Sequence, residues 1–270
     1  MIDYSLITNN IRKELKTYLQ KSGLKSVVLG ISGGIDSALC VALAKPVCDE
    51  LGVKIFGRFI TIESNKQDEI DRGNVVGNVF CHDYEEIDLT HEYEVLSMGL
   101  NEREGVLGGE RIDKIRLGNV KARLRMIYIY NLAQLHKGMV LSTDNFTELM
   151  LSFFTLHGDV GDYGMVQNLW KMEVYGLSKW IALNEGGVGS PVYNALIPCV
   201  DAIPTDGLGI TDSDFDQLGV DTYDEVDQLI KEEMAFLNQD NPVAKRVRDF
   251  KFKRENPYNI PRDILFGSES

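Results

Sequence analysis

VVLGISGGIDS, residues 27–37, is the stretch that decides which fold this chain is expected to adopt. Its first residues are apolar and partly β-branched, which is typical of a buried strand. The small residues 32–34 interrupt this run, and an Ala-rich helical pattern follows from Asp36 onward. The stretch therefore predicts a strand, a tight turn and a helix in direct succession.

A turn of this kind is suited to binding phosphate, because free backbone N–H groups and the helix dipole converge there. Glycine allows phosphate oxygens to approach closely, and Asp36 is a suitable ligand for Mg²⁺. The motif SGGIDS resembles the SGGxDS pyrophosphate loop of the ATP pyrophosphatases, which cleave ATP between the α- and β-phosphates. A tight turn that is capped by Asp36 and Ser37 and binds no ligand is the simpler alternative.

Composition sets the broad class of the protein. The chain has 270 residues, of which 44% are hydrophobic, and we expect residues 1–270 to form a single domain. It shows no apolar run long enough to cross a bilayer and no signal-peptide pattern, so we expect a cytoplasmic protein without a membrane partner. The four scattered cysteines favour reduced thiols. A net charge of −13 argues against nucleic acid as a partner.

Hydrophobic periodicity predicts alternating strands and helices along the chain. Strands are expected at residues 27–31, 53–60, 86–89 and 139–143. Helices are expected at residues 6–20, from 36 onward, and at 65–80, 113–137, 168–184, 222–237 and 242–252. Residues 102–109, 186–190 and 200–214 are expected to be loops, the first of them mobile. This βαβ alternation favours a doubly wound parallel sheet flanked by helices, a Rossmann-like α/β fold of the ATP pyrophosphatase type.

A second polar stretch, residues 142–171, follows the predicted strand 139–143 and should face the phosphate loop across the sheet edge. It contains Thr143-Asp144, Glu148, Phe153-Phe154-Thr155, Gly158-Asp159 and Lys171. In this order and spacing the stretch resembles the ammonia-dependent NAD synthetases. The similarity extends from about Gly30 to Arg254, and it includes the segment GNVKARLRM before residue 127.

The resemblance implies a carbon–nitrogen ligase of NAD biosynthesis. Such an enzyme uses ATP to adenylate deamido-NAD, and ammonia then displaces AMP to give NAD; Mg²⁺ assists, and pyrophosphate is the other product. The 26 residues before the first strand are too few for a glutaminase domain, so ammonia is expected to be free or supplied by a partner. The family forms homodimers, and the resemblance implies a homodimer here.

The resemblance also assigns roles to individual residues. It implies catalytic roles for Asp36, Glu148, Lys171 and Asp162, with Asp36 and Glu148 as the Mg²⁺ ligands. The implied ATP-binding residues are Gly30, Ser32, Gly33, Gly34, Asp36, Ser37, Arg58, Thr143, Lys171 and Thr205. The implied deamido-NAD-binding residues are Asn119, Arg123, Arg125, Phe153, Asp159 and Lys253.

Simpler interpretations of single residues stay open at this point. Glu148 could be a helix cap, Lys171 a solvated helix charge, and Phe153 part of the core. Arg123 and Arg125 could form salt bridges in so acidic a chain. We expect Lys171 to act on the transition state and not on stability, because its helix has apolar residues that pack without it.

Other functions within the same fold also remain open. A GMP-synthetase-like ligase is disfavoured by the Phe-Phe-Thr…Gly-Asp…Lys arrangement, and a tRNA-thiolating enzyme by the absence of paired cysteines and by the negative charge. A non-catalytic nucleotide-binding relative is supported only by Phe252 and Phe215, which stand where the family has a histidine and a glutamate.

Overall fold

The computed structural model describes residues 2–63, 65–100, 109–204, 215 and 218–266. A parallel sheet with the strand order β3-β2-β1-β4-β5 forms its centre. The strands are β1 (Ser26–Gly30), β2 (Lys54–Thr61), β3 (Asp83–Asp88), β4 (Gly138–Ser142) and β5 (Tyr163–Gly164). The chain starts in the middle, builds outward to β3, and returns to add β4 on the other side of β1. The predicted doubly wound parallel sheet is therefore confirmed.

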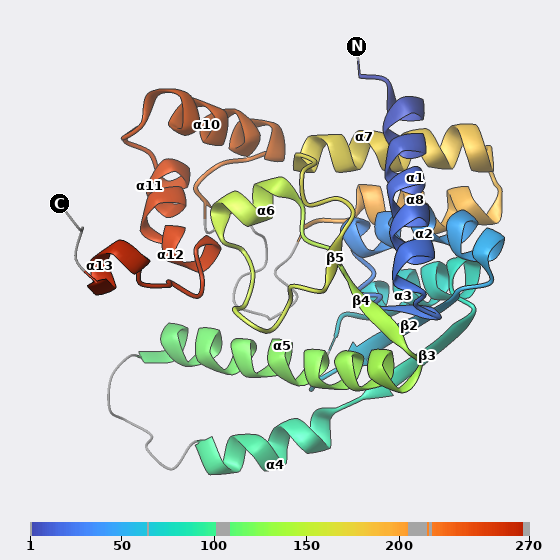
Figure 1. Ribbon diagram of the computed structural model, residues 1–270, viewed down its shortest axis with the longest axis horizontal. Helices are drawn as coiled ribbons and strands as arrows, with labels where there is room; N and C mark the ends of the chain where they lie inside the picture. The colour runs from blue at the N-terminus through green and yellow to red at the C-terminus, as the bar shows by residue number, and fades with distance from the viewer. Residues whose placement is uncertain (1, 64, 101–108, 205–214, 216–217, 267–270) are drawn as a thin grey trace.

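Helices cover both faces of this sheet (Figure 1). One face carries α1 (Tyr4–Ser22), α2 (Ile35–Leu51), α3 (Gln67–Phe80), α7 (Lys171–Ile181) and α8 (Pro191–Asp201), and the other carries α4 (Thr90–Leu100) and α5 (Gly109–Leu135). The sheet has one apolar core on each face, and alternate residues of β1 pack into one or the other, because successive side chains of a strand point to opposite faces. Val27 and Leu29 belong to the core on the α2 face, and Val28 packs with Ile129 of α5.

A third apolar cluster joins the C-terminal helices to the strand end. It contains Leu151 of α6 (Phe146–Leu151), Val226 and Ile230 of α10 (Tyr223–Phe236) and Val247 of α11 (Pro242–Asp249). Two short helices, α12 (Lys251–Arg254) and α13 (Arg262–Phe266), follow. Because α6 comes directly after β4, this cluster holds the C-terminal helices beside the carboxyl end of the sheet (Figure 1).

The structure differs from the predicted elements in several places. The helix predicted for residues 168–184 begins at Lys171 and passes at its end into a π-helix, Ala182–Gly186. The helices α4, α6 and α8 and the two-residue strand β5 were not predicted, although Ser190 and Pro191 form a recognisable helix start for α8. The acidic strand β3 starts earlier than expected, at Asp83. The loops expected at residues 102–109 and 200–214 lie largely outside the described residues.

None of the helices in the described part of the chain has the length and apolarity needed to cross a bilayer. Cys40, Cys48, Cys81 and Cys199 are all free thiols.

Candidate active site

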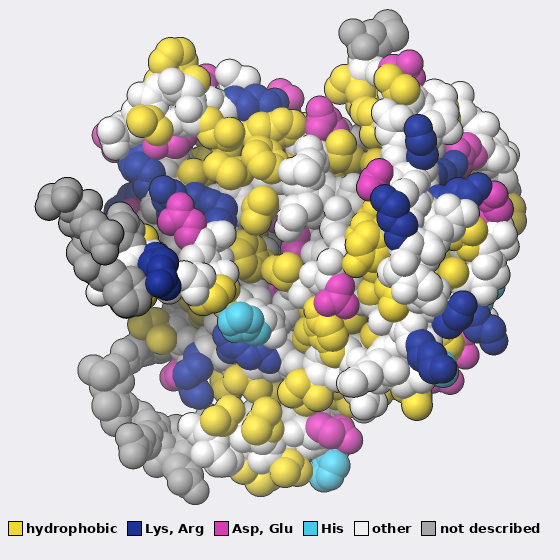
Figure 2. Space-filling view, in the orientation of Figure 1, with side chains coloured by type: hydrophobic (Ala, Val, Ile, Leu, Met, Phe, Trp, Pro, Cys, Tyr) yellow, Lys and Arg dark blue, Asp and Glu magenta, His cyan; other side chains and the backbone are white. Residues whose placement is uncertain are grey.

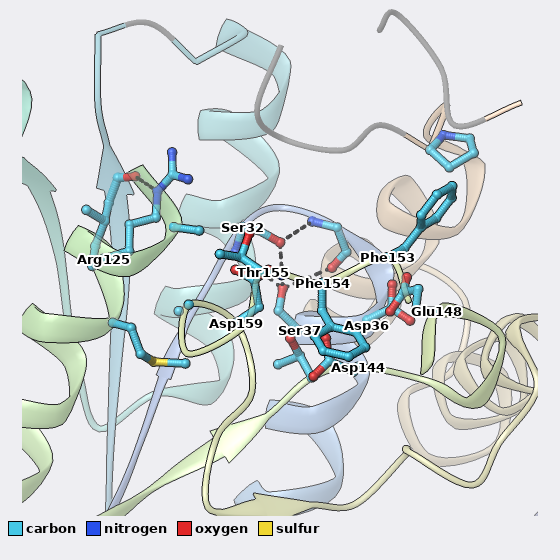
Figure 3. A pocket seen from close by; sticks show the side chains of 18 of the residues that line it. Ser32, Asp36, Ser37, Arg125, Asp144, Glu148, Phe153, Phe154, Thr155 and Asp159 are labelled. Carbon is cyan, nitrogen blue, oxygen red and sulfur yellow. Dashed lines mark hydrogen bonds between the residues drawn. The ribbon is translucent and has the colours of Figure 1, made fainter. Parts of the chain in front are cut away.

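The loop at residues 32–37, which the sequence predicts to bind phosphate and which is called the phosphate loop below, has the predicted form. β1 ends at Gly30, and α2 begins at Ile35 with no side chain capping its first N–H groups. Gly33 has a φ of +76°, and a Cβ there would lie 2.3 Å from the backbone oxygen of Glu69 on α3, so only glycine fits. Ser32 Oγ lies 3.2 Å from Ser37 Oγ, which places two hydroxyl groups beside the loop (Figure 3).

A charged cluster stands next to this loop. Lys171 Nζ donates to Asp36 Oδ2 at 2.5 Å and to Glu148 Oε1 at 3.0 Å. These residues come from the first turns of α7, α2 and α6. Figure 3 shows the Asp36 and Glu148 carboxylates close to each other at one side of the cavity. The solvated-charge interpretation of Lys171 is wrong, since its side chain is only 5% exposed.

The electrostatics of the cluster follow from its burial. Burial, reinforced by the nearby charge of Asp36, raises the pKa of Glu148. Burial alone would lower the pKa of Lys171, but the carboxylates of Asp36 and Glu148 hold it well above the usual value for lysine. The cluster therefore contains a buried ammonium ion between two acidic side chains, of which Glu148 holds its proton to a higher pH than an ordinary glutamate does.

Asn145 connects the two carboxylates. Its Nδ2 donates to Asp36 Oδ1 at 2.8 Å, and its Oδ1 accepts from the backbone N of Glu148 at 3.0 Å. Glu148 Oε2 in turn accepts from the backbone N of Asn145, which completes a capping box. Glu148 is thus a helix cap and a member of the charged cluster at once.

A second polar group lies across the same cavity. Thr155 Oγ1 donates to Asn119 Oδ1 at 2.6 Å, and Thr155 N donates to Asp159 Oδ2 at 2.5 Å. Arg125 Nε donates to the backbone oxygen of Ile60 (Figure 3). These contacts bring residues from α5 and from the loop after α6 to one place.

Lys253 of α12 closes this side of the cavity. Its Nζ donates to the backbone oxygens of Ser152, at 2.8 Å, and Phe154. Burial and the charge of Arg246 lower the pKa of Lys253 to about 8. The Arg246 guanidinium carbon lies 4.2 Å from the centre of the Phe153 ring. The C-terminal helices thus supply cations and contacts to aromatic rings at the cavity wall.

Two further carboxylates face the cavity without an ion pair among the described contacts. Burial raises the pKa of Asp144 to about 7, against a lowering contribution from the Ser142 hydroxyl, which donates to Asp144 Oδ2 at 2.9 Å. Burial likewise raises the pKa of Asp159. Asp144 can therefore take up and release a proton near neutral pH, and Asp159 holds its proton to a higher pH than an ordinary aspartate does.

One cavity of about 840 Å³ connects both groups. Fifteen of the predicted site residues line it: Gly30, Ser32, Gly34, Asp36, Ser37, Arg58, Asn119, Arg123, Arg125, Thr143, Glu148, Phe153, Asp159, Lys171 and Lys253. Gly33 does not line the cavity and lies against the backbone of Glu69 on α3. Thr205 lies outside the described residues.

The structure does not bring Asp162 into the cavity. Asp162 Oδ1 accepts from the Tyr130 hydroxyl and Oδ2 from the backbone N of Val140, each at 2.9 Å. Both carboxylate oxygens therefore serve the edge of the sheet, which corrects the expected place of Asp162 beside the ammonia nucleophile. Arg58 lines the cavity, but its guanidinium group faces β3 and lies 2.8 Å from Asp83 Oδ1.

Several residues at or beside the cavity were not identified from the sequence as site residues. The capping-box pattern from Asn145 to Glu148 was a usable signal for Asn145. Asp144 stands out in the sequence only as part of the Thr143-Asp144 motif. Arg246 carried no local signal, because only the fold brings α11 against Phe153.

Residues 7–261 match the family model described as NAD synthase. This chain belongs to the NAD synthase family. The NH(3)-dependent NAD(+) synthetase of Finegoldia magna is 31% identical to it over 94% of this chain and 92% of that protein. The NH(3)-dependent NAD(+) synthetase of Methanococcoides burtonii is 30% identical over 93% of each chain.

Solved structures agree with this NAD synthase fold. The NMN synthetase from Francisella tularensis superposes with a TM-score of 0.77 at 22% identity, covering 97% of this chain and 100% of that chain. The NAD+ synthetase from Burkholderia pseudomallei gives a TM-score of 0.69 at 25% identity, covering 95% and 92%. The phosphate loop and the charged cluster therefore lie in a NAD synthase fold.

Proposed function

We propose that this chain is an ammonia-dependent NAD synthetase. One observation carries the proposal: the phosphate loop, the Asp36–Lys171–Glu148 cluster and the polar group around Asp159 share a single cavity. An enzyme that joins ATP to a second nucleotide needs two such adjacent subsites. The names of the relatives, NH(3)-dependent NAD(+) synthetases, give the most direct support for the substrate pair.

The residues suggest how the reaction would proceed. The loop N–H groups and the hydroxyls of Ser32 and Ser37 would hold the phosphates of ATP. The nicotinate carboxylate of deamido-NAD would attack the α-phosphorus, so that pyrophosphate leaves and an acyl adenylate forms. Lys171 would offset the negative charge that develops on the phosphate oxygens. Arg58 and Thr143 remain predicted ATP contacts, as does Thr205.

Ammonia would then attack the carbonyl carbon of the adenylate, and AMP would leave. The incoming nitrogen must lose protons, and Asp144 and Asp159 are the nearby carboxylates whose pKa values are raised by burial. Deamido-NAD would be held by Asn119, Arg123, Arg125, Phe153 and Lys253, as the family resemblance implies.

Mg²⁺ fits the charged cluster. Asp36 and Glu148 offer two carboxylates beside the phosphate loop, and the structure shows no group of three or more metal-ligating side chains among the described residues. One or two carboxylates plus substrate phosphates is the usual magnesium arrangement at ATP sites. When bound, Mg²⁺ would supply positive charge to the phosphates.

We further propose a homodimer that uses α4 and α5. Apolar side chains are exposed on both helices: Val95, Leu96, Met98, Leu100, Ile112, Ile115, Ile127 and Leu135. Figure 2 shows apolar side chains gathered over these helices. Ile112 and Ile115 also line the cavity, so a second copy placed there would border the site. Cytoplasmic location and a single domain remain predictions from the sequence.

The test is the appearance of NAD, AMP and pyrophosphate when the protein meets deamido-NAD, ATP, Mg²⁺ and ammonium. Glutamine replaces ammonium in one parallel reaction. Nicotinate mononucleotide and xanthosine monophosphate replace deamido-NAD in two others, which tests an NMN-synthetase and a GMP-synthetase activity. We expect NAD from deamido-NAD with ammonium, and little product with glutamine.

Asp36→Asn should abolish turnover, whereas Asp49→Asn, the same change at the far end of α2, should not. Absence of AMP release from the wild-type protein with every acceptor would instead favour a non-catalytic relative.

A further inference from the structure

Helix α10 reaches the reactive lysine from outside the cavity. Asp227 of α10 is only 2% exposed and does not line the cavity. Its Oδ1 accepts a hydrogen bond from Thr147 Oγ1 at 2.5 Å, and its Oδ2 accepts one from the backbone N of Met172 at 3.2 Å. Both oxygens of this carboxylate are therefore engaged by α6 and by the first turn of α7.

Thr147 continues this connection to Lys171. The backbone N of Lys171 donates to Thr147 Oγ1 at 2.9 Å, while the same hydroxyl donates its own hydrogen to Asp227. The two hydrogen bonds thus form one chain, in which Lys171 N donates to the Thr147 hydroxyl and this hydroxyl donates to the Asp227 carboxylate. Thr147 is fully buried, so water does not compete for these bonds.

Lys171 is consequently held by α10 at two points. Its backbone is fixed through Thr147 and Asp227, and its ammonium group lies 5.2 Å from the centre of the Tyr223 ring at the start of α10. The position of the Lys171 backbone therefore decides whether its ammonium group reaches Asp36 and Glu148. A displacement of α7 by about 1 Å would misplace the ammonium group at the phosphates.

We propose that Asp227 is a positioning residue for Lys171, acting through the Thr147 hydroxyl and the first backbone N–H groups of α7. The inference rests on the proposed function, in which Lys171 acts on the transferring phosphoryl group. Asp227 also satisfies an N–H group in the first turn of α7, which the side chain of the N-cap residue Trp170 leaves uncapped. The test therefore has to separate positioning of Lys171 from a contribution to stability. Val226 and Ile230 already anchor α10 in its apolar cluster.

Glu233 offers a matched control on the same helix. It is also 2% exposed, and its two oxygens accept from the backbone N of Asn238, at 3.0 Å, and of Gln239, at 2.7 Å. It pairs with Arg248 and, among its described contacts, has none with α6 or α7. Glu233→Gln therefore repeats the chemical change of Asp227→Asn without touching Lys171.

The experiment measures kcat, the KM values for ATP and deamido-NAD, and Tm for five variants beside wild type. These are Asp227→Asn, Thr147→Val, the double variant, Thr147→Ser and Glu233→Gln. We expect Asp227→Asn and Thr147→Val each to lower kcat about 10- to 100-fold, the usual effect of removing a supporting hydrogen-bond partner, with both KM values nearly unchanged. The double variant should be no slower than the slower single variant, since both changes break one chain of bonds.

Thr147→Ser keeps the hydroxyl and should keep kcat, and Glu233→Gln should lower Tm without lowering kcat. If Asp227→Asn does not fold, the comparison of Thr147→Val with Thr147→Ser tests the proposal alone. The proposal is overturned if Thr147→Val or a folded Asp227→Asn retains full kcat, if the double variant shows multiplied losses, or if Glu233→Gln loses as much kcat at equal Tm. Failure of the wild-type protein to make NAD would overturn the proposed function instead, which keeps the two outcomes apart.

Discussion

Lys171 Nζ lies 2.5 Å from Oδ2 of Asp36, a residue 135 positions earlier in the chain. The ammonium group stands between the two carboxylates that are the proposed Mg²⁺ ligands. Without metal and nucleotide, the lysine is therefore the countercharge of the pair. In the proposed reaction we expect the same lysine to turn toward the phosphates of ATP.

Lys171→Met should reduce kcat about 10²- to 10³-fold, because an electrostatic contact made in the transition state is lost. It should also lower Tm in the absence of Mg²⁺, since removing one partner of a buried ion pair costs about 3–5 kcal/mol. Mg²⁺ should raise the Tm of this variant more than that of wild type. Thermal melts with and without Mg²⁺ measure these changes in Tm, and Lys179→Met, at an exposed position of the same helix, is the control. If Mg²⁺ raised the Tm of wild type and of Lys171→Met by the same amount, the prediction would be contradicted.

Asn145→Ser separates capping from positioning. Serine is as good a helix cap as asparagine, so the free energy of unfolding should fall only by the lost hydrogen bond to Asp36, about 1.5–3 kcal/mol. Serine is too short to reach Asp36 as the Asn145 amide does, and we expect kcat to fall by about tenfold or more. Steady-state kinetics and melts on one preparation measure both effects. Asn241→Ser, the same change at the cap of α11, should leave kcat intact.

Asp144→Asn should alter the pH dependence of stability. The pKa of Asp144 is about 7 in the folded protein and about 3.9 in the unfolded chain. Between these values the folded state binds more protons, so the contribution of Asp144 to stability falls as pH rises through 7. Urea unfolding of wild type and variant at pH 5 and pH 8 should show wild type losing about 2–4 kcal/mol more than the variant. Parallel losses would show that Asp144 titrates normally.

Ile127→Glu should dissociate the proposed dimer. Ile127 is 65% exposed on α5, and a charge buried at an apolar interface is costly. Light scattering should give the mass of two chains for wild type and of one chain for the variant. Val188→Glu, at a site that is 80% exposed and away from α4 and α5, is the matched control. A wild-type mass of one chain at micromolar concentration would refute the dimer.

The sheet was predictable because local signals coincide with it. The runs that became β1 and β4 are short and apolar, and β2 is apolar apart from Lys54, Gly57 and Arg58. Turns or helical patterns bound all three. β3 is harder to predict, since the acidic residues Asp83 and Glu85 hide its pattern at the sheet edge. Helix α4 escaped prediction because its exposed apolar residues blur the helical period.

Much of the site was also predictable, because the motif residues follow strand ends that a parallel sheet brings together. The environment of Lys171 was not, since its burial depends on Thr147, Tyr223 and Asp227 from other helices. The expectation that Lys171 is dispensable for stability is replaced for that reason. Asp162 shows the opposite case, in which a motif residue serves the sheet edge.

The contact of Gly33 with α3 bears on which sequence changes natural selection can accept. Arg72 of α3 donates to the backbone oxygen of Gly33 at 2.9 Å. The loop therefore contacts α3 both through this hydrogen bond and through the close packing of Gly33 against Glu69. A mutant with any side chain at position 33 would need a compensating shift of the whole helix. Gly23 and Gly52 also have positive φ values but open space around them, so asparagine can replace them over evolutionary time. At position 33 asparagine has no space for its side chain, so we expect this residue to stay glycine as lineages diverge.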